Sequence, residues 1–388
     1  MNQKKLVILE DSSLRSFGGG QKISLLITKI FLKKSFKVEV YDTCKDSEFC
    51  QKLQNKVILK SYNNIINNFG KSNIFKNNFK ALIWVLSILT FLKNYKKSNN
   101  SYVLATTKKT YILILLLKLI YGKRFQKGDL IIYYHMCNQY VLFEQIYYFL
   151  ISVLESITNL IHSKKFEILH LYVSKCARDS FNNFNLLKNK YNTIIYNPAI
   201  EENVLKNLRD DYNIVLETNP KKLVIISSLN KFKGVFEFVE IFKSLSFKNL
   251  CDFELHIYGY GEEENKIKKV SQNKSNIHFH GKINSPFKAL KDAYCVILPS
   301  IISEACPLVA IESICAGRPC FSRNFGGQKE LLKDSNKYID NSTSYKLIES
   351  ILNLEKKYLL EISTLFSKKY ETNFSQKIYS YNIQKLIN

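Results

Sequence analysis

Short apolar runs alternate along the chain with longer stretches of helical periodicity. Runs rich in Val, Ile, Leu and Tyr with polar flanks predict buried strands, and the stretches between them predict helices. The predicted strands are Lys5–Leu9, Lys37–Tyr41, Tyr102–Ala105, Leu130–Tyr134, Glu167–Val173, Thr193–Tyr196, Lys222–Ser227, Glu254–Tyr258, Asn276–His280, Tyr294–Leu298 and Pro319–Ser322. Because strands and helices alternate, and because each half begins with a fresh strand, the pattern predicts two doubly wound α/β domains.

The boundary between these domains is expected near Asn197-Pro198, where proline ends a strand. The polar and acidic residues 199–221 that follow predict a hinge or linker. We therefore expect an N-terminal domain over residues 1–198 and a C-terminal domain over 222–373. Residues 374–388 carry apolar side chains near helical spacing and predict a final amphipathic helix.

Three longer apolar stretches are candidates for membrane contact, at residues 80–92, 111–121 and 141–161. A membrane-spanning helix needs about 20 mostly uncharged residues. The first two stretches are shorter and Lys118 interrupts the second, whereas Glu144 and Glu155 interrupt the third. These stretches predict buried or interfacial helices, and a membrane-surface role for one of them stays open.

The composition, with 46% hydrophobic and 23% charged residues over 388 positions, is that of a globular protein long enough for two domains. The formal net charge of +24 favours anionic partners: nucleic acid, anionic lipid or phosphorylated small molecules. A lysine-rich solvated surface that reflects genome bias is the alternative. Because the basic residues are scattered without a nucleic-acid-binding motif, we expect an anionic membrane surface and phosphate-bearing substrates, and no nucleic acid.

The nine cysteines form no Cys-x-x-Cys pair and have no zinc-ligand spacing. Most of them lie in apolar runs, which predicts reduced, buried thiols in a reducing compartment. The segment Met1–Glu10 has too few apolar residues for a signal peptide. We therefore expect a cytoplasmic protein, with a peripheral position on the inner membrane face as an extension of that expectation.

The segment from Leu298 to Pro319 holds the most informative pattern. A buried strand ends there, a short loop carries Glu304, and Pro307 is expected in the first turn of a helix that Gly317 terminates. The start of such a helix offers N–H groups and a positive dipole end to a diphosphate. Glu304 and Glu312 can accept hydrogen bonds from sugar hydroxyls, so the segment predicts a nucleotide-sugar site. The residues expected to contact the donor at this turn are Cys306, Pro307, Leu308 and Val309.

Glu304-x7-Glu312, followed by Ala316-Gly317-x-Pro319, resembles the Glu-x7-Glu motif of the retaining family 4 glycosyltransferases. The next segment, Asn324 to Glu330, matches their Gly-Gly-x-x-Glu loop. The resemblance covers nearly the whole chain and implies a GT-B fold, with two Rossmann-like domains facing across a cleft. It assigns the acceptor to the N-terminal domain and the nucleotide sugar to the C-terminal domain, and it implies that the last helix crosses back to the N-terminal domain.

In the N-terminal half, Gly18-Gly19-Gly20 resembles the glycine loop that lies beside the donor phosphate and the acceptor in this family. A flexible turn without a ligand is the alternative. His135 ends a strand where relatives often carry a histidine that faces the cleft, although a satisfied core histidine fits equally. Arg178 lies in a segment similar to the family's Ser-Lys-x-x-Arg-Asp helix start. It is expected either to reach phosphate or acceptor or to form an ion pair with Asp179.

In the C-terminal half, the segment from Ser227 to Gly234 resembles the family's Gly-Arg-Leu-x-x-x-Lys-Gly loop, whose basic residues neutralise the donor diphosphate. Lys233 matches the lysine, but Ser228 stands at the position of the arginine. Lys231 is the candidate for the second charge. Gly259 lies in a Gly-x-Gly turn that resembles the one beside the nucleoside, and a turn without a ligand is the alternative.

The resemblance implies a hexosyltransferase (EC 2.4 type) that retains the anomeric configuration and transfers sugar from a UDP- or GDP-type donor. The net charge, the lysine-rich helices and the apolar stretches of the N-terminal half favour a saccharide or lipid-linked acceptor of bacterial surface polysaccharide or lipopolysaccharide synthesis. Lys233 and the helix start near Pro307 would stabilise the leaving diphosphate, Glu304 would hold the donor sugar, Glu312 the ribose, and His135 would face the transferred sugar. No Asp-x-Asp motif follows a predicted strand, so neither a metal nor another cofactor is expected.

Three other classes stay open at this point. A non-catalytic GT-B protein that binds a saccharide or a partner is favoured by Ser228 at the arginine position. A nucleic-acid-binding protein would account for the charge of +24. A sugar-nucleotide epimerase of the same fold is the enzymatic alternative, although such relatives do not normally carry the Glu304-x7-Glu312 context.

Overall fold

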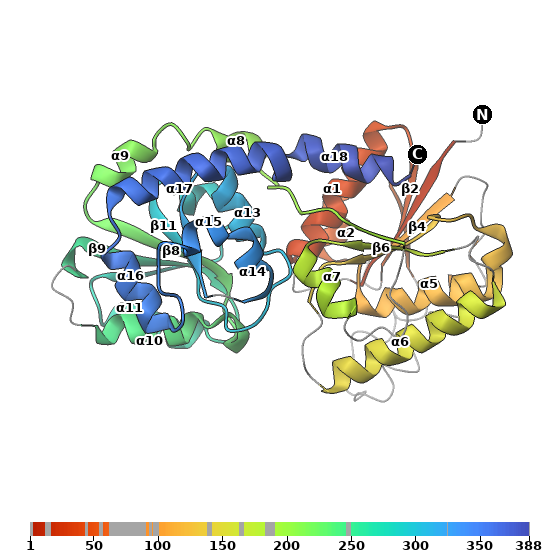
Figure 1. The fold of residues 1–388 in the computed structure, drawn as a ribbon, viewed down its shortest axis with the longest axis horizontal. Helices are drawn as coiled ribbons and strands as arrows, with labels where there is room; N and C mark the ends of the chain where they lie inside the picture. Colours follow the sequence, from red (N-terminus) through yellow and green to blue (C-terminus); the bar gives the residue numbers. More distant parts are fainter. Residues whose placement is uncertain are drawn as a thin grey trace. The chain divides into compact units, whose positions relative to one another are not determined.

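The computed structural model describes residues 3–11, 17–42, 46–53, 57–61, 91–92, 95, 101–137, 142–162, 167–182, 191–245, 250–323 and 325–387. The chain divides into two compact units, each with one parallel sheet flanked by helices (Figure 1). Unit 1 comprises Met1–Val173, Arg178–Ile195 and Ser380–Asn388, and unit 2 comprises Ser174–Ala177 and Tyr196–Tyr379. The predicted class of two doubly wound α/β sheets is confirmed.

The sheet of unit 1 has seven strands in the order β3-β2-β1-β4-β5-β6-β7. Its strands are β1 (Lys5–Leu9), β2 (Lys37–Asp42), β3 (Ile58–Ser61), β4 (Ser101–Ala105), β5 (Leu130–Tyr134), β6 (Leu169–Tyr172) and β7 (Asn192–Ile194). Its helices include α1 (Gly19–Lys33), α2 (Glu48–Lys52), α5 (Lys108–Tyr121), α6 (Leu142–Ile161) and α7 (Lys175–Asn182). The predicted strands are all present, and β3 is an additional strand whose short apolar run between lysines does not predict it.

The sheet of unit 2 has five strands in the order β10-β9-β8-β11-β12. They are β8 (Lys221–Ser228), β9 (Phe253–Tyr260), β10 (Ile277–Gly281), β11 (Ala293–Leu298) and β12 (Cys320–Ser322). The chain moves outward from β8 to β10 and then returns to β11 on the other side of β8. Right-handed crossovers therefore place α10 (Val235–Ser244) and α11 (Glu264–Gln272) on the face opposite α13 (Leu308–Cys315).

The remaining helices of unit 2 are short or follow the last strand. They are α8 (Glu202–Lys206), α9 (Tyr212–Glu217), α12 (Phe287–Leu290), α14 (Gly326–Leu331), α15 (Lys333–Asn336), α16 (Ser344–Leu352), α17 (Lys356–Lys369) and α18 (Gln376–Lys385). The segment expected to be a hinge thus contains α8 and α9, whose Leu205, Tyr212 and Leu216 are buried. The final helix begins at Gln376 rather than at Phe374, because Tyr370–Phe374 form a π-helical turn before it.

Helix α13 ends as its sequence predicts. The N–H of Gly317 donates to the carbonyl of Ile314 and the N–H of Arg318 to that of Ser313, which is the Schellman arrangement. At the other end, Pro307 is the N-cap with extended dihedrals and α13 begins at Leu308, so the expected first-turn proline is wrong by one position. The Arg318 side chain is fully buried and donates to three carbonyls, those of Leu208, Leu290 and Lys291.

Helix α6 is amphipathic with a buried acid. Glu155 accepts a hydrogen bond from Nε2 of His170 on β6 at 2.9 Å, so this charge faces the sheet. The opposite side exposes apolar residues near helical spacing: Phe149, Leu150, Ile157, Leu160 and Ile161. Within the described part of the chain, no helix is long and apolar enough to span a membrane. The stretch 80–90 and the basic pairs at 96–97 and 164–165 lie outside the described residues.

Candidate functional site

The switch point of the second sheet lies between β8 and β11, because the connections from these neighbouring strands lead to opposite sides. Ligands of open parallel sheets bind at the carboxyl ends of strands at such a point. Two predicted residues meet there: the Nζ of Lys233, from the loop after β8, pairs with Oε2 of Glu304, from the loop after β11. The structure therefore brings together the two residues that the sequence assigned to the donor phosphate and the donor sugar.

A capped turn holds the Lys233 backbone. The Asn230 side chain accepts from the N–H of Lys233 at 3.2 Å, and residues Lys231–Lys233 form a single 3-10 turn before α10. Ser228, at the end of β8, is exposed, and its hydroxyl accepts from Nδ2 of Asn230 at 3.3 Å. The Lys231 side chain is also exposed and has no acidic partner among the residues that the structure describes. One paired lysine and one exposed lysine therefore follow β8.

Two residues that the sequence did not single out orient the Glu304 carboxylate. Ser300 Oγ donates to Oε1 of Glu304, and Gln328 Nε2 donates to the same oxygen at 3.2 Å. The backbone is fixed as well, because the N–H of Gly327 donates to the carbonyl of Glu304 at 2.8 Å. A Cβ at Gly327 would lie 1.9 Å from the carbonyl oxygen of Ala305, so only glycine permits this approach. The glycine pair of the sequence motif thus serves to hold the Glu304 loop.

The start of α13 follows this loop directly. The N–H groups of Leu308 and Val309 precede the first hydrogen bonds of the helix, as required for an anion site. Cys306 is buried, and burial raises the pKa of its thiol to about 12, so it stays neutral. Glu312 lies one turn into α13 with 4% of its surface exposed.

The glycine turn after β9 has a structural reason of its own. Gly259 has φ 154°, and a Cβ there would lie 1.8 Å from the carbonyl oxygen of Ser227 on β8. A side chain is therefore excluded by the neighbouring strand, whether or not a nucleoside approaches. The predicted alternative of a turn defined by the fold is sufficient to explain this glycine.

Glu330, the last residue of the Gly-Gly-x-x-Glu loop, caps a helix. Its carboxylate accepts from the N–H groups of Lys175 at 3.2 Å and Cys176 at 3.0 Å, and also from the hydroxyl of Tyr196. These residues all belong to unit 2, and the two N–H groups open α7. A carboxylate at this end also stabilises the helix dipole.

In unit 1 the glycine triplet and His135 come together. Gly18 is the N-cap of α1, and a Cβ at Gly20 would lie 3.9 Å from Cγ of His135, the residue that follows β5. Neither ring nitrogen of His135 has a hydrogen-bond partner among the described residues. Burial lowers the pKa of His135 to about 3, so its imidazole is neutral. A neutral imidazole suits a hydroxyl partner rather than a phosphate.

Glu10 is a residue that the sequence analysis missed. It directly follows β1, next to the switch point between β1 and β4, and only 2% of its surface is exposed. Its Oε2 accepts from the hydroxyls of Ser24 at 2.7 Å and Thr106 at 2.8 Å. Burial raises the pKa of Glu10 to about 7. An acid directly after a buried strand was the available signal.

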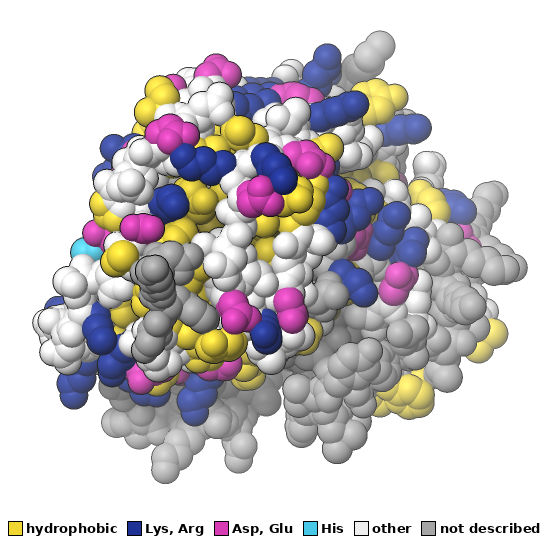
Figure 2. Space-filling model, turned by 60° about the vertical axis from the view of Figure 1, so that its left-hand side comes forward, with side chains coloured by type: hydrophobic (Ala, Val, Ile, Leu, Met, Phe, Trp, Pro, Cys, Tyr) yellow, Lys and Arg dark blue, Asp and Glu magenta, His cyan; other side chains and the backbone are white. Residues whose placement is uncertain are grey.

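Arg178 forms the ion pair with Asp179 that was one of its two expected roles. Its guanidinium forms an ion pair with the adjacent Asp179, with Nε and Nη2 each 2.8 Å from Oδ1. On the face shown in Figure 2, Lys and Arg side chains are interspersed with Asp and Glu rather than gathered into one continuous patch. The excess of positive charge on this face is therefore diffuse.

Comparisons with known proteins agree with this architecture. Residues 209–371 match the family described as glycosyl transferases group 1. The structure is similar to that of Anabaena HepE in complex with UDP, with a TM-score of 0.72, 15% identity and 98% of each chain covered. It is also similar to a glycosyltransferase from Rickettsia africae (TM-score 0.68, 14% identity, 100% of this chain and 98% of that chain). A third similar structure is WaaG, a glycosyltransferase involved in lipopolysaccharide biosynthesis (TM-score 0.66, 14% identity, 98% of each chain). None of the curated proteins matches the sequence.

The two parallel sheets, with matching structures over the full length, define a GT-B fold. The match of residues 209–371 assigns this part of unit 2 to the group 1 glycosyltransferases, which are enzymes of the hexosyltransferase type. The predictions of the family, the fold class and the enzyme class are confirmed.

Proposed function

We propose that the protein transfers a hexose from a UDP-type sugar donor to a saccharide or lipid-linked acceptor, with retention of the anomeric configuration. The observation that carries the proposal is the pairing of Lys233 with Glu304 at the switch point of the second sheet. The preference for UDP is supported by Anabaena HepE, whose structures contain UDP and UDP-glucose. The acceptor class is suggested by the lipopolysaccharide role of WaaG.

Each group at this switch point has a role in the proposal. The Lys233 ammonium and the N–H groups at the start of α13 bind the diphosphate and stabilise the charge that develops when it leaves. Glu304, held by Ser300 and Gln328, accepts hydrogen bonds from the donor sugar. Glu312 accepts hydrogen bonds from the ribose hydroxyls. The exposed Lys231 supplies the second positive charge at the diphosphate, in place of the arginine that is usual in the family.

The glycosidic bond to the diphosphate oxygen breaks, and the acceptor hydroxyl oxygen bonds to the anomeric carbon on the same face. The acceptor proton goes to the departing phosphate oxygen. No protein nucleophile and no metal ion take part in this proposal. In unit 1, the neutral His135 beside Gly20 is the proposed hydrogen-bonding partner of a sugar hydroxyl.

Thermal unfolding with UDP, GDP and their glucose conjugates, each with and without EDTA, tests donor binding. UDP at about 100 times its Kd should stabilise the protein by about 2.7 kcal/mol, and Glu312→Ala should abolish the shift. The stabilisation by UDP should be the same with EDTA. Glu349→Gln, which changes a partly exposed carboxylate on α16, is the matched control and should keep the stabilisation by UDP.

Release of UDP from UDP-glucose with a panel of saccharide acceptors tests transfer, and the anomeric proton coupling of the product reports the configuration. Ser228 at the arginine position favours a second candidate, a non-catalytic GT-B protein that binds nucleotide sugar. Binding of UDP-glucose without release of UDP for any acceptor would favour that candidate. An inverted product would refute retention.

We also propose that α6 rests on an anionic membrane surface, as a peripheral contact near a lipid-linked acceptor. The exposed apolar side of α6 includes Leu150 (58% exposed) and Leu160 (86%), and the chain carries a net charge of +24. Sedimentation with anionic and neutral vesicles tests this. Leu150→Gln with Leu160→Gln should weaken binding to anionic vesicles, whereas Ile214→Gln, an equally exposed apolar residue on α9, should not. Equal binding of both variants would refute the contact.

A further inference from the structure

Three of the six histidines of the chain lie together at one edge of the second sheet. Side chains alternate between the faces of a strand, so Glu254 and His256 share one face of β9. On β10, His280 lies at a register shift, and its ring stacks on that of His256 at 5.1 Å, so it is on the same face. The strands pair in parallel with His256 opposite His278, which brings His278 onto this face as well. The adjacent residues Leu255, Ile257 and Ile277 are buried on the other face.

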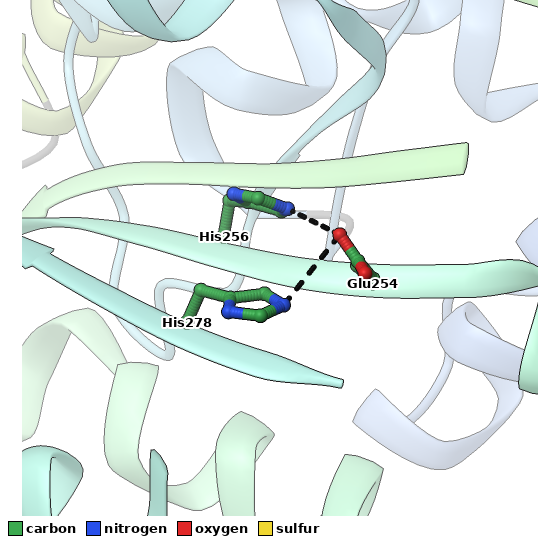
Figure 3. Close-up of side chains that lie close together, drawn as sticks. All are labelled: Glu254, His256 and His278. Carbon is green, nitrogen blue, oxygen red and sulfur yellow. Dashed lines mark hydrogen bonds and ion pairs between the residues drawn. The ribbon is translucent and has the colours of Figure 1, made fainter. Parts of the chain in front are cut away.

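The polar atoms of this group converge on one carboxylate oxygen. Nε2 of His256 lies 3.0 Å from Oε2 of Glu254, and Nε2 of His278 lies 3.5 Å from the same oxygen. Figure 3 shows both imidazoles directed at the Glu254 carboxylate from neighbouring strands. Behind them, Nδ1 of His256 is 2.9 Å from Nε2 of His280. His280 therefore holds the His256 ring through the nitrogen that does not face Glu254.

Hydrogen bonding within the protein leaves part of this group unsatisfied. Nε2 of His278 is buried but has no hydrogen-bond partner among the residues that the structure describes. Neutral imidazoles beside a carboxylate form the donor set that binds zinc and similar ions.

We propose that Glu254, His256 and His278 bind one divalent transition-metal ion, zinc being the expected one, that fastens β10 to β9. In a tetrahedral site with bonds of 2.0–2.1 Å, the ligand atoms are about 3.3 Å apart. The observed 3.0 and 3.5 Å from Glu254 to the two imidazoles are already close to that spacing. Water fills the fourth position, because the His278 side chain is 36% exposed and the group borders solvent.

The remaining contacts fit this role. With a metal ion on Nε2 of His256, the proton of this ring lies on Nδ1 and can be donated to Nε2 of His280, 2.9 Å away, as in the outer hydrogen bonds of metal-bound histidines. The mixed nitrogen and oxygen donors favour zinc, copper or nickel over magnesium or calcium. The proposed ion lies at Glu254 and His256, in the first half of β9. Lys233 and Glu304 instead follow the carboxyl ends of β8 and β11. It is therefore a structural ion, and the sugar transfer does not involve it.

Zinc binding to tag-free, chelator-treated protein tests the proposal, by competition with a chromophoric chelator. We expect one equivalent of Zn²⁺ per chain and a zinc-dependent rise of Tm. Glu254→Gln, which keeps the side-chain shape, and His278→Gln, at a partly exposed position, should each weaken binding at least about tenfold. Glu240→Gln, an exposed carboxylate on α10, is the control and should bind as the wild type does.

Cobalt substitution gives a second readout, because the absorption spectrum distinguishes imidazole and carboxylate ligands from thiolates. A cobalt spectrum without a thiolate charge-transfer band, lost in both variants, supports the site. The proposal is overturned if wild-type protein binds no stoichiometric Zn²⁺, or if binding survives in both Glu254→Gln and His278→Gln. A thiolate band that carries the binding would also overturn it, since the metal would then lie on cysteines.

Discussion

Lys233 and Glu304, 71 residues apart in the sequence, form an ion pair after the two central strands of the second sheet. Both side chains are mostly buried, with 23% and 17% of their surfaces exposed, so their charges interact more strongly than a surface pair does. Without donor, Glu304 satisfies the charge of Lys233. In the proposed reaction the donor diphosphate replaces Glu304 as the anionic partner of Lys233. The hydrogen bonds from Ser300 and Gln328 then keep Glu304 in place.

Replacement of this lysine tests its role in stabilising the leaving group. Lys233→Met should lower kcat/KM about 10²- to 10³-fold, which is the typical loss when one group that stabilises developing charge is removed. Lys243→Met removes the same charge from the exposed side of α10 and should change kcat/KM less than about twofold. Steady-state kinetics of UDP release are the measurement. Similar losses in the two variants would mean that net charge, rather than position, matters.

The serine at the family's arginine position predicts a gain of function. Ser228→Arg places a guanidinium at the exposed end of β8, where it can bind the donor diphosphate. We expect UDP to bind about tenfold more tightly, equivalent to about 1.4 kcal/mol. Titration calorimetry measures the Kd, with Ser244→Arg on α10 as the control for added charge. An unchanged Kd in Ser228→Arg would show that this position does not face the diphosphate.

The buried Glu10 predicts a specific pH dependence of stability. Because burial raises its pKa from 4.5 to about 7, the folded protein keeps a proton that the unfolded chain releases above pH 4.5. Its contribution to the free energy of unfolding is full below pH 4.5 and is lost as the pH rises to about 7. Glu10→Gln cannot titrate, so the variant should gain up to about 3 kcal/mol relative to the wild type between pH 4.5 and pH 8.

Urea unfolding of both proteins at pH 5 and pH 8 measures this difference. The comparison cancels the other titrating groups, because they are common to the two proteins. A constant difference between the variant and the wild type at the two pH values would contradict the raised pKa of Glu10.

The helix cap formed by Glu330 predicts an effect on stability without an effect on donor binding. Glu330→Gln weakens the charge-assisted hydrogen bonds to Lys175, Cys176 and Tyr196 and should lower the free energy of unfolding by about 1–3 kcal/mol. The Kd of UDP should change less than about twofold. Calorimetric unfolding and UDP titration are the two measurements. A large loss of UDP affinity at unchanged stability would instead place this carboxylate at the donor.

The sequence alone predicted the class of fold and the family. Alternating apolar runs give parallel strands because only segments buried on both faces are continuously apolar, and the predicted strands are present with shifted ends. Local chemistry was equally readable: Gly317 ends α13 because a helix terminus needs a residue that accepts a positive φ. The Glu304 and Lys233 motifs were found because their spacing and their flanking glycines are local properties of the chain.

Tertiary structure decided which of these residues meet. Strand order set Lys233 against Glu304 and placed Ser300 and Gln328 on the same carboxylate, and no local spacing encodes that order. The alternation of Glu254 with His256, and of His278 with His280, was visible in the sequence. Only the parallel register of β9 and β10 brings His278 beside His256 and Glu254, so that the three side chains form one group of proposed ligands. Periodicity determines which face a side chain occupies, whereas pairing between distant segments determines its neighbours, and neighbours decide the chemistry.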